Sequence, residues 1–235
     1  MYQACVENDV VITFCHQRRF GGQFIKAKEL ANDGTIGQLR RVEGSCANMF
    51  DWGTHWFDMF FFYNNEVPAE WLIGQIDVAE ESSAFGVQVE TSGVAWIGYE
   101  NGVQGLLVTG ATGLTGGEGP RNRLVGTDGI IEVGGRELPP LRVLAKGYDA
   151  WRVPDLDKGV ASGEETVASV LDLVDCLENG REPELSARKA LRATELIFAT
   201  YESSRRRAKI HLPLDVDDSA LVTMVEEGLI GPRRI

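Results

Sequence analysis

Short apolar segments follow one another between residues 69 and 153, and they constrain the fold more than any other feature. They are rich in β-branched and aromatic residues and cover 71–73, 94–97, 103–108, 123–125, 130–133 and 141–145. Asn101-Gly102 and Asp128-Gly129 stand between neighbouring segments, and both dipeptides are strong hairpin turns. The pattern predicts an open, mostly antiparallel sheet with short connections.

Two helices are predicted after this sheet. The first begins at the capping box Ser162-Gly163-Glu164-Glu165, in which Glu165 can reach back to the Ser162 amide, and Gly180 ends it. Its apolar residues form one stripe of the kind that faces a core: Val167, Val170, Leu171, Val174 and Leu177. Ser186 caps the second helix, which runs to about Arg207.

Further elements precede the sheet and follow the helices. Residues 1–8 resemble the last turns of a helix, 21–32 form a helix that Gly34 ends, and 39–46 form a strand. Asp51 is a suitable N-cap for an aromatic helix over 56–63. Pro213 confines 210–214 to an edge, because proline cannot donate to a ladder. A run of strands followed by helices indicates the α+β class.

The segment 10–15, Val-Val-Ile-Thr-Phe-Cys, is continuously apolar. Such runs are typical of strands in a parallel sheet that is covered on both faces. No similar strand–helix unit follows, so we expect the chain to open inside a domain rather than at its beginning. Cys15 and Cys176 lie in apolar patterns and are expected in the core.

Charge and composition narrow the possible partners. The net charge is −12, and an acidic surface repels phosphate backbones, which argues against nucleic acid. The basic run Arg205-Arg206-Arg207 falls at a predicted helix end, where cations suit the dipole. No apolar stretch is long enough to span a membrane, no signal-peptide pattern begins the chain and no C-x-x-C pair occurs. We therefore expect a reducing cytoplasm.

Asp51, His55 and Asp58 are the best candidates for chemistry. On a helix, residues three and four apart share one face, so both carboxylates can approach the histidine. One carboxylate would fix the tautomer while the free ring nitrogen exchanges a proton with substrate. Spacing alone leaves two alternatives open: a capped helix with a merely polar His55, and a metal site, although no second histidine lies nearby.

Four stretches, in order along the chain, resemble the glucose–fructose oxidoreductase / inositol dehydrogenase (Gfo/Idh/MocA) family. They are His16-Gln17-Arg18-Arg19-Phe20, the helix and turn from Ala27 to Gly37, the motif Asp51-x-Gly53-x-His55-x-x-Asp58, and the tail from Glu195 to Leu214. Each stretch is weak alone, but the ordered set covers nearly the whole chain.

The resemblance implies an oxidoreductase that uses NAD or NADP on a CH–OH group of a sugar or polyol. His55 matches the family's proton-handling histidine, and Asp51 matches its carboxylate partner, with Asp58 in support. Arg18 matches a residue near the nicotinamide and substrate, although Arg19 could take that role instead or be a surface residue. Trp52, inside the motif, is also expected near the substrate and nicotinamide.

In fold, the resemblance implies an open sheet with helices on one face, whose outer face often mediates homo-oligomerisation. Residues 1–20 would be the remnant of a dinucleotide-binding domain, and 21–235 the substrate-binding and oligomerisation domain. No metal is implied.

The sequence also departs from the family. No G-x-G-x-x-G motif follows a strand, although those glycines let the backbone approach a pyrophosphate. Gly113-x-x-Gly116-Gly117-x-Gly119 lies between antiparallel strands and is interpreted as a flexible loop. The family's E-K-P lysine would lie upstream, and Asn48-Met49-Phe50 replaces a glycine-rich stretch. We therefore expect the chain alone to bind NAD(H) poorly.

Three hypotheses follow, each from a different class of protein. The chain is the C-terminal part of a dehydrogenase, or a non-catalytic module that binds a sugar or assembles through its sheet, or a metal-dependent hydrolase or isomerase built on the Asp–His cluster. A G-x-G-x-x-G segment encoded upstream would favour the first hypothesis, and a stoichiometric metal would favour the third.

Overall fold

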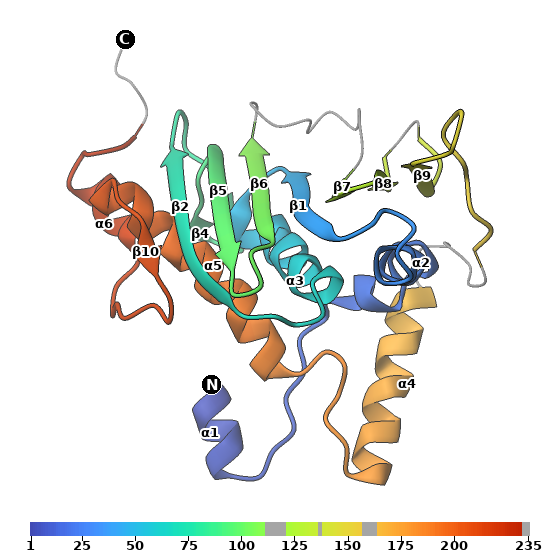
Figure 1. Ribbon diagram of the computed structural model, residues 1–235. Helices are drawn as coiled ribbons and strands as arrows, with labels where there is room; N and C mark the ends of the chain where they lie inside the picture. Colours follow the sequence, from blue (N-terminus) through green and yellow to red (C-terminus); the bar gives the residue numbers. More distant parts are fainter. Residues whose placement is uncertain (111–120, 136–137, 157–163, 232–235) are drawn as a thin grey trace.

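A single large sheet organises the computed structural model, which describes residues 1–110, 121–135, 138–156 and 164–231 (Figure 1). Within these residues the sheet has eight strands, in the order β10-β2-β5-β6-β1-β7-β8-β9. Their bounds are β1 Leu39–Cys46, β2 Ala69–Asp77, β5 Ser92–Tyr99, β6 Gln104–Gly110, β7 Asn122–Gly126, β8 Gly129–Val133, β9 Leu141–Ala145 and β10 Ile210–His211. A separate small hairpin pairs β3 Ser83–Ala84 with β4 Val87–Gln88.

The pairing confirms the predicted sheet. β1 and β6 are parallel, with Arg41 opposite Gln104, and every other neighbouring pair in the described sheet is antiparallel. Each apolar segment expected between residues 69 and 153 lies within a strand, except that Val103 directly precedes β6. β10 is an edge strand, as Pro213 predicted. The turn glycine Gly102 has a φ of +80°, which glycine adopts without a steric cost.

Helices cover one face of the sheet (Figure 1). They include α2 Gly22–Asn32, α3 Thr54–Tyr63 and α5 Ala187–Arg206, close to the predicted ranges, while α1 Tyr2–Glu7 and α6 Ala220–Glu226 lie near the ends of the chain. α3 is buried along almost its whole length from Trp56 to Tyr63, because it packs against both the sheet and α5. A helix that is apolar on all sides is stable only in such a buried position.

Two serines fasten α5 to β2. The Ser203 Oγ accepts a hydrogen bond from the Gly74 amide at 2.8 Å, and the Ser204 Oγ accepts one from the Ile76 amide at 3.2 Å. Gly74 permits this approach, because a Cβ at that position would lie 2.5 Å from the Thr200 Cγ2. The helix is therefore held against the strand at backbone distance.

The strand expected at 10–15 does not form, and this prediction is wrong for the described structure. Val10 and Val11 are 57% and 50% exposed, Cys15 is exposed rather than in the core, and Thr13 makes an isolated bridge to Ser186. A buried parallel strand needs a parallel neighbour, and none lies beside this segment among the residues that the structure describes.

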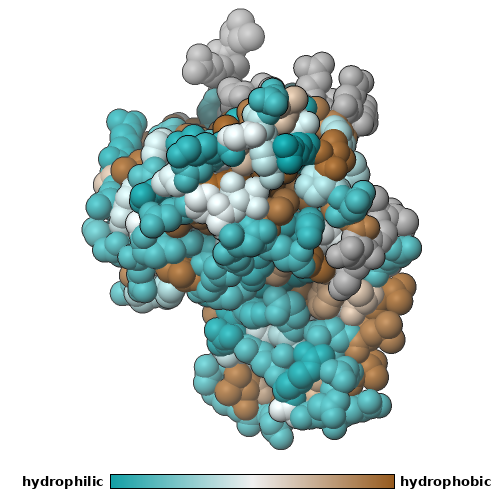
Figure 2. All heavy atoms as spheres, turned by 45° about the vertical axis from the view of Figure 1, so that its right-hand side comes forward, coloured by the Kyte–Doolittle hydropathy of each residue, from teal (hydrophilic) through white to brown (hydrophobic). Residues whose placement is uncertain are grey.

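Helix α4, Glu164–Asn179, ends at Gly180 as predicted, with a φ of +66°. The proposed cap Ser162 lies outside the described residues, as does the glycine-rich run 113–119. The apolar stripe of α4 does not face a core: its five residues, Val167, Val170, Leu171, Val174 and Leu177, are 47% to 62% exposed. Hydrophobic residues gather along the lower part of the surface in Figure 2, where α4 lies. Cys176, by contrast, is buried.

The C-terminal basic run has a local explanation. Arg205 and Arg206 both pair with Glu202 one turn earlier, and Arg207 ends α5 in the left-handed conformation. The cations lie at the negative end of the helix dipole, as expected.

Among the described residues, no helix has the length and apolar character needed to cross a membrane.

Candidate active site

The turn that carries Asp51 and Trp52 is a short π-helix, η2 Met49–Gly53. The Gly53 amide donates to the Asn48 carbonyl at 2.8 Å, an i→i+5 bond, and the Asn48 Oδ1 accepts from the Asp51 amide at 2.8 Å. Asn48 is therefore the cap, and the prediction that Asp51 caps the helix is wrong. π-turns of this kind are frequent at functional sites.

His55 lies in the first turn of α3 and is half-buried. Its Nδ1 is buried and has no hydrogen-bond partner among the described residues. Burial lowers the pKa of His55 to about 3, and the nearby cation Arg18 and the ring of His16 lower it in the same direction. The imidazole is therefore neutral at pH 7 and retains an unused nitrogen for an incoming group.

The expected partnership of His55 with Asp51 is not formed by any hydrogen bond or ion pair among the described residues. The wider turn of η2 accounts for this, because the four-residue spacing brings side chains onto one face only in a regular α-helix. Asp51 remains half-buried on the turn directly before the histidine.

The carboxylate of Asp58 pairs with His16 rather than with His55. Its carboxylate accepts from the Arg19 Nε at 2.7 Å and from the Arg19 Nη2 at 2.9 Å, and its Oδ1 lies 3.3 Å from the Nδ1 of His16. Burial alone would raise the pKa of Asp58, but His16 and Arg19 hold it well below its usual value. The histidine–carboxylate pair of this site is therefore His16–Asp58.

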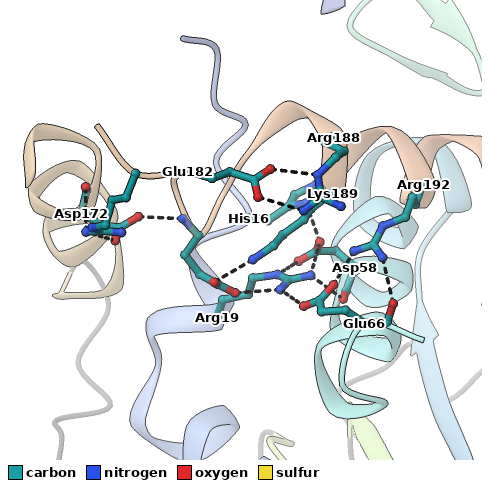
Figure 3. Close-up of polar contacts among 11 residues, drawn as sticks. His16, Arg19, Asp58, Glu66, Asp172, Glu182, Arg188, Lys189 and Arg192 are labelled. Atoms are coloured by element: carbon teal, nitrogen blue, oxygen red, sulfur yellow. Dashed lines mark hydrogen bonds and ion pairs between the residues drawn. The ribbon is translucent and has the colours of Figure 1, made fainter. Parts of the chain in front are cut away.

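Arg19 is the buried centre of an ion network (Figure 3). Besides Asp58, its Nη1 donates to Glu66 at 2.5 Å and to Glu184 at 2.8 Å, and its side chain has no exposed surface. Arg192 also pairs with Glu66, and Lys189 with Glu184. Its donors are taken by carboxylates and its side chain is buried, so Arg19 is not a surface residue.

Arg18 has the opposite environment. Its guanidinium lies 4.6 Å from the ring centroid of buried Trp56 and 5.7 Å from that of Trp52, which is 43% exposed. The Arg18 Nη1 is buried and has no hydrogen-bond partner among the described residues. Burial, and after it the charge of Arg121, lowers the pKa of Arg18 to about 10, while Glu165 opposes the shift.

Two features of the site were missed by sequence reasoning. His16 donates to or accepts from the Thr54 Oγ1 at 3.1 Å, and its ring meets that of His55 edge-on at 5.2 Å. Its place just before Arg18 and Arg19 in the first family-like stretch was the signal for it.

Glu90 is the second missed residue, and it is 1% exposed. It accepts from the Tyr201 hydroxyl at 2.7 Å and from the Met49 amide at the start of η2. Burial raises the pKa of Glu90. Tyr201 belongs to the family-like tail, but no local pattern pointed to its carboxylate partner.

The described residues fit a substrate better than a whole dinucleotide. The orphaned Nδ1 of His55 and the orphaned Nη1 of Arg18 are buried polar atoms that a ligand could satisfy. No described segment provides a glycine-rich strand–turn–helix of the kind that holds a pyrophosphate. Nor do the described histidines, cysteines and carboxylates form a group of three that could hold a metal ion.

Solved structures share this fold. An oxidoreductase from Agrobacterium radiobacter in complex with NAD+, L-tartaric acid and magnesium is 18% identical, with a TM-score of 0.68 over 89% of this chain and 67% of that chain. The aldose-aldose oxidoreductase from Caulobacter crescentus, complexed with glycerol, is 19% identical, with a TM-score of 0.71 over 89% and 66%. The WlbA dehydrogenase from Bordetella pertussis, in complex with NADH and UDP-GlcNAcA, is 20% identical, with a TM-score of 0.65 over 91% and 67%.

At these identities the likeness establishes the fold, and the chain spans about two thirds of the length of these structures. No curated protein matches the chain in sequence. The family model for the C-terminal alpha/beta domain of the Gfo/Idh/MocA oxidoreductases matches residues 33–212, which is most of the chain. The chain therefore belongs to the Gfo/Idh/MocA oxidoreductase family, as the ordered set of motifs predicted.

Proposed function

We propose that the chain supplies the substrate-binding and proton-handling part of an NAD(P)-dependent oxidoreductase that acts on a CH–OH group of a sugar or polyol. The observation that carries the proposal is His55: a neutral imidazole with a buried, unpartnered Nδ1, next to the unsatisfied guanidinium of Arg18. A neutral histidine can accept the proton of a hydroxyl as that hydroxyl is oxidised.

The neighbouring residues have distinct roles in this proposal. A bound nicotinamide supplies the hydride chemistry, and the residues of this chain hold the substrate and its proton. Asp51, on η2, contacts substrate hydroxyls, and exposed Trp52 forms a wall of the binding site. Asp58 acts through His16, whose ring meets that of His55, and is therefore a positioning residue. The choice between NAD and NADP rests on residues outside this site.

The test is turnover in the complete gene product, followed by the absorbance of reduced nicotinamide over a panel of sugars and polyols. His55→Ala should lower turnover by roughly 100-fold or more, as expected when a general acid–base is lost. His211→Ala, at an exposed histidine of β10, is the matched control. Near-normal turnover of His55→Ala would remove His55 from its role. Ligand binding without any NAD(P)-dependent turnover would identify a non-catalytic sugar-binding module instead.

We also propose that residues 1–20 and the apolar face of α4 pack against a dinucleotide-binding half, while 21–235 form the substrate domain. Exposed Val10 and Val11 and the exposed stripe of α4 support this, because apolar surfaces of such extent usually mark interaction sites. Leu171→Glu should weaken that packing in the complete gene product, measured as faster hydrogen exchange at residues 10–14. Leu191→Glu, at an exposed leucine of α5, is the control; equal effects of the two changes would contradict the proposal.

The outer face of the sheet is a proposed site of homo-oligomerisation. Ile73 on β2 and Val94 and Trp96 on β5 are 50%, 38% and 41% exposed on neighbouring strands. Trp96→Glu is expected to shift the protein to a smaller species in sedimentation. An unchanged sedimentation coefficient for this variant would exclude this face as the contact between copies.

A further inference from the structure

The guanidinium of Arg18 contacts two aromatic rings, but at least one of its N–H donors has no acceptor among the described residues. Trp56 and Trp52 lie against its guanidinium, and such contacts engage the flat face of the group. The N–H donors point along the plane of the guanidinium, and at least one of them, Nη1, is buried without an acceptor. A buried donor left in this state is costly, which makes the site receptive to an acceptor.

A second arginine of the same protein combines such an aromatic contact with a carboxylate. Arg142 lies 4.3 Å from the ring centroid of Trp151, and its Nε donates to Glu132 at 2.7 Å. Arg142 thus combines an aromatic neighbour with a carboxylate, which is the strong, charge-assisted form of an arginine contact. Arg18 has the aromatic neighbours but forms no ion pair with a carboxylate among the described residues.

Two buried carboxylates of the site are bound by other residues. Asp58 is taken by Arg19 and His16, and Glu90 by Tyr201 and the Met49 amide. Glu165, from α4, is near enough to act on Arg18 electrostatically but forms no ion pair with it among the described residues. In a chain of net charge −12, Arg18 therefore forms no ion pair among the described residues, with Glu165 as an opposite charge and Arg121 as a further positive charge nearby.

We propose that Arg18 binds an anionic group of the substrate, so that the ligand is a sugar acid of the aldonate or uronate class rather than a neutral sugar or polyol. A planar guanidinium matches a carboxylate in a bidentate pair, and the rings of Trp52 and Trp56 hold it in place for that contact. The inference rests on the proposed function, because it places the reacting hydroxyl beside His55 in the same molecule.

A bound carboxylate has a second effect, on His55. The charge of Arg18 is among the causes that lower the pKa of His55. A carboxylate on Arg18 cancels part of that charge, and the pKa of His55 then rises toward its ordinary value.

The experiment compares ligands that differ only in charge. Tryptophan fluorescence of the chain, to which exposed Trp52 contributes, is titrated with small aldonates and uronates and with their amides and the matching alditols. For at least one carbon skeleton the acid should bind about 10-fold or more tightly than its amide, as expected for a hydrogen-bonded charge. Equal affinity of acids and amides across the panel would overturn the inference.

Variants locate the preference on Arg18. Arg18→Gln should abolish the difference between acid and amide, and Arg18→Lys should keep part of it, because lysine retains the charge but not the fork. Arg142→Gln, which also removes an arginine stacked on a tryptophan, should leave the difference unchanged. If Arg18→Gln does not fold, the comparison of acid with amide in the wild-type chain still decides. An acid preference that survives Arg18→Gln would also overturn the assignment.

This outcome is separable from that of the proposed function. Binding of acids needs neither NAD(P) nor proton transfer at His55. If the wild-type chain prefers acids but shows no turnover, the proposed function is contradicted and the proposed ligand class is supported. If neutral polyols are turned over in a way that depends on His55 and acids are not preferred, the proposed function is supported and the proposed ligand class is contradicted.

Discussion

The depressed pKa of His55 makes a quantitative prediction about stability in acid. The pKa is about 3 in the folded chain and about 6.5 in the unfolded chain. Between these values the unfolded state binds a proton that the folded state does not, so the free energy of unfolding falls as pH decreases. The contribution of His55 is complete above the unfolded pKa and is lost progressively toward the folded one.

The magnitude follows from the two pKa values. Near pH 5 the unfolded imidazole is almost fully protonated and the folded one is almost fully neutral, which removes about 2 kcal/mol of stability relative to pH 7.5. His55→Gln carries no titrating ring and escapes this loss. The wild-type chain should therefore lose about 2 kcal/mol more than His55→Gln between the two conditions.

Urea unfolding at the two pH values measures the difference. Both proteins share their remaining titratable groups, so the comparison isolates one ring, and equal m-values show that the unfolded states are comparable. His211→Gln, at an exposed position of β10, is the matched control for removing a histidine. If wild type and His55→Gln lose the same stability on acidification, burial and the charge of Arg18 do not act on His55 as described.

The remaining predictions concern the contacts around the site. Asp58→Asn should lower the free energy of unfolding by about 3–5 kcal/mol, because it leaves buried Arg19 short of its main partner. Asp218→Asn, which breaks an exposed pair with Arg205, should have a much smaller effect in the same urea titration. Tyr201→Phe should cost about 1–3 kcal/mol by depriving buried Glu90 of a donor, and an unchanged midpoint would show that the contact contributes nothing. NADH fluorescence should reveal only weak binding to the 235-residue chain, because its sequence contains no G-x-G-x-x-G motif; a dissociation constant in the low micromolar range would contradict this.

The parts of the fold that the sequence could predict are those that depend on residues close together in the chain. The strand segments, the turns at Gly102 and Gly129 and the ends of α2, α4 and α5 follow from periodicity and from residues that permit or stop an element. These signals act within a few residues, and they held because the sheet is built mainly from neighbouring hairpins.

The wrong predictions depended on distant partners. The segment 10–15 and the stripe of α4 have the composition of buried elements, but burial requires something to pack against. Within the site, Asp58 was expected only to support His55 and Asp51, and sequence reasoning did not foresee that Arg19 and His16, far away in sequence, bind its carboxylate. The π-turn that carries Asp51 begins at Met49, whose amide donates to Glu90, another long-range contact that spacing cannot reveal.

The position of β1 has a consequence for how the chain assembles. β1 is the first strand in sequence, but it lies inside the sheet between β6 and β7, with Arg41 opposite Gln104 in one ladder and Val42 opposite Leu124 in the other. The hairpins β5–β6 and β7–β8–β9 can form from residues close together in the chain. β1 can pair only after β6 and β7 have been made, and its parallel pairing with β6 closes a long loop. During synthesis on the ribosome, β1 and the aromatic helix α3 behind it are therefore the parts that stay longest without their partners and most need protection from association with other chains.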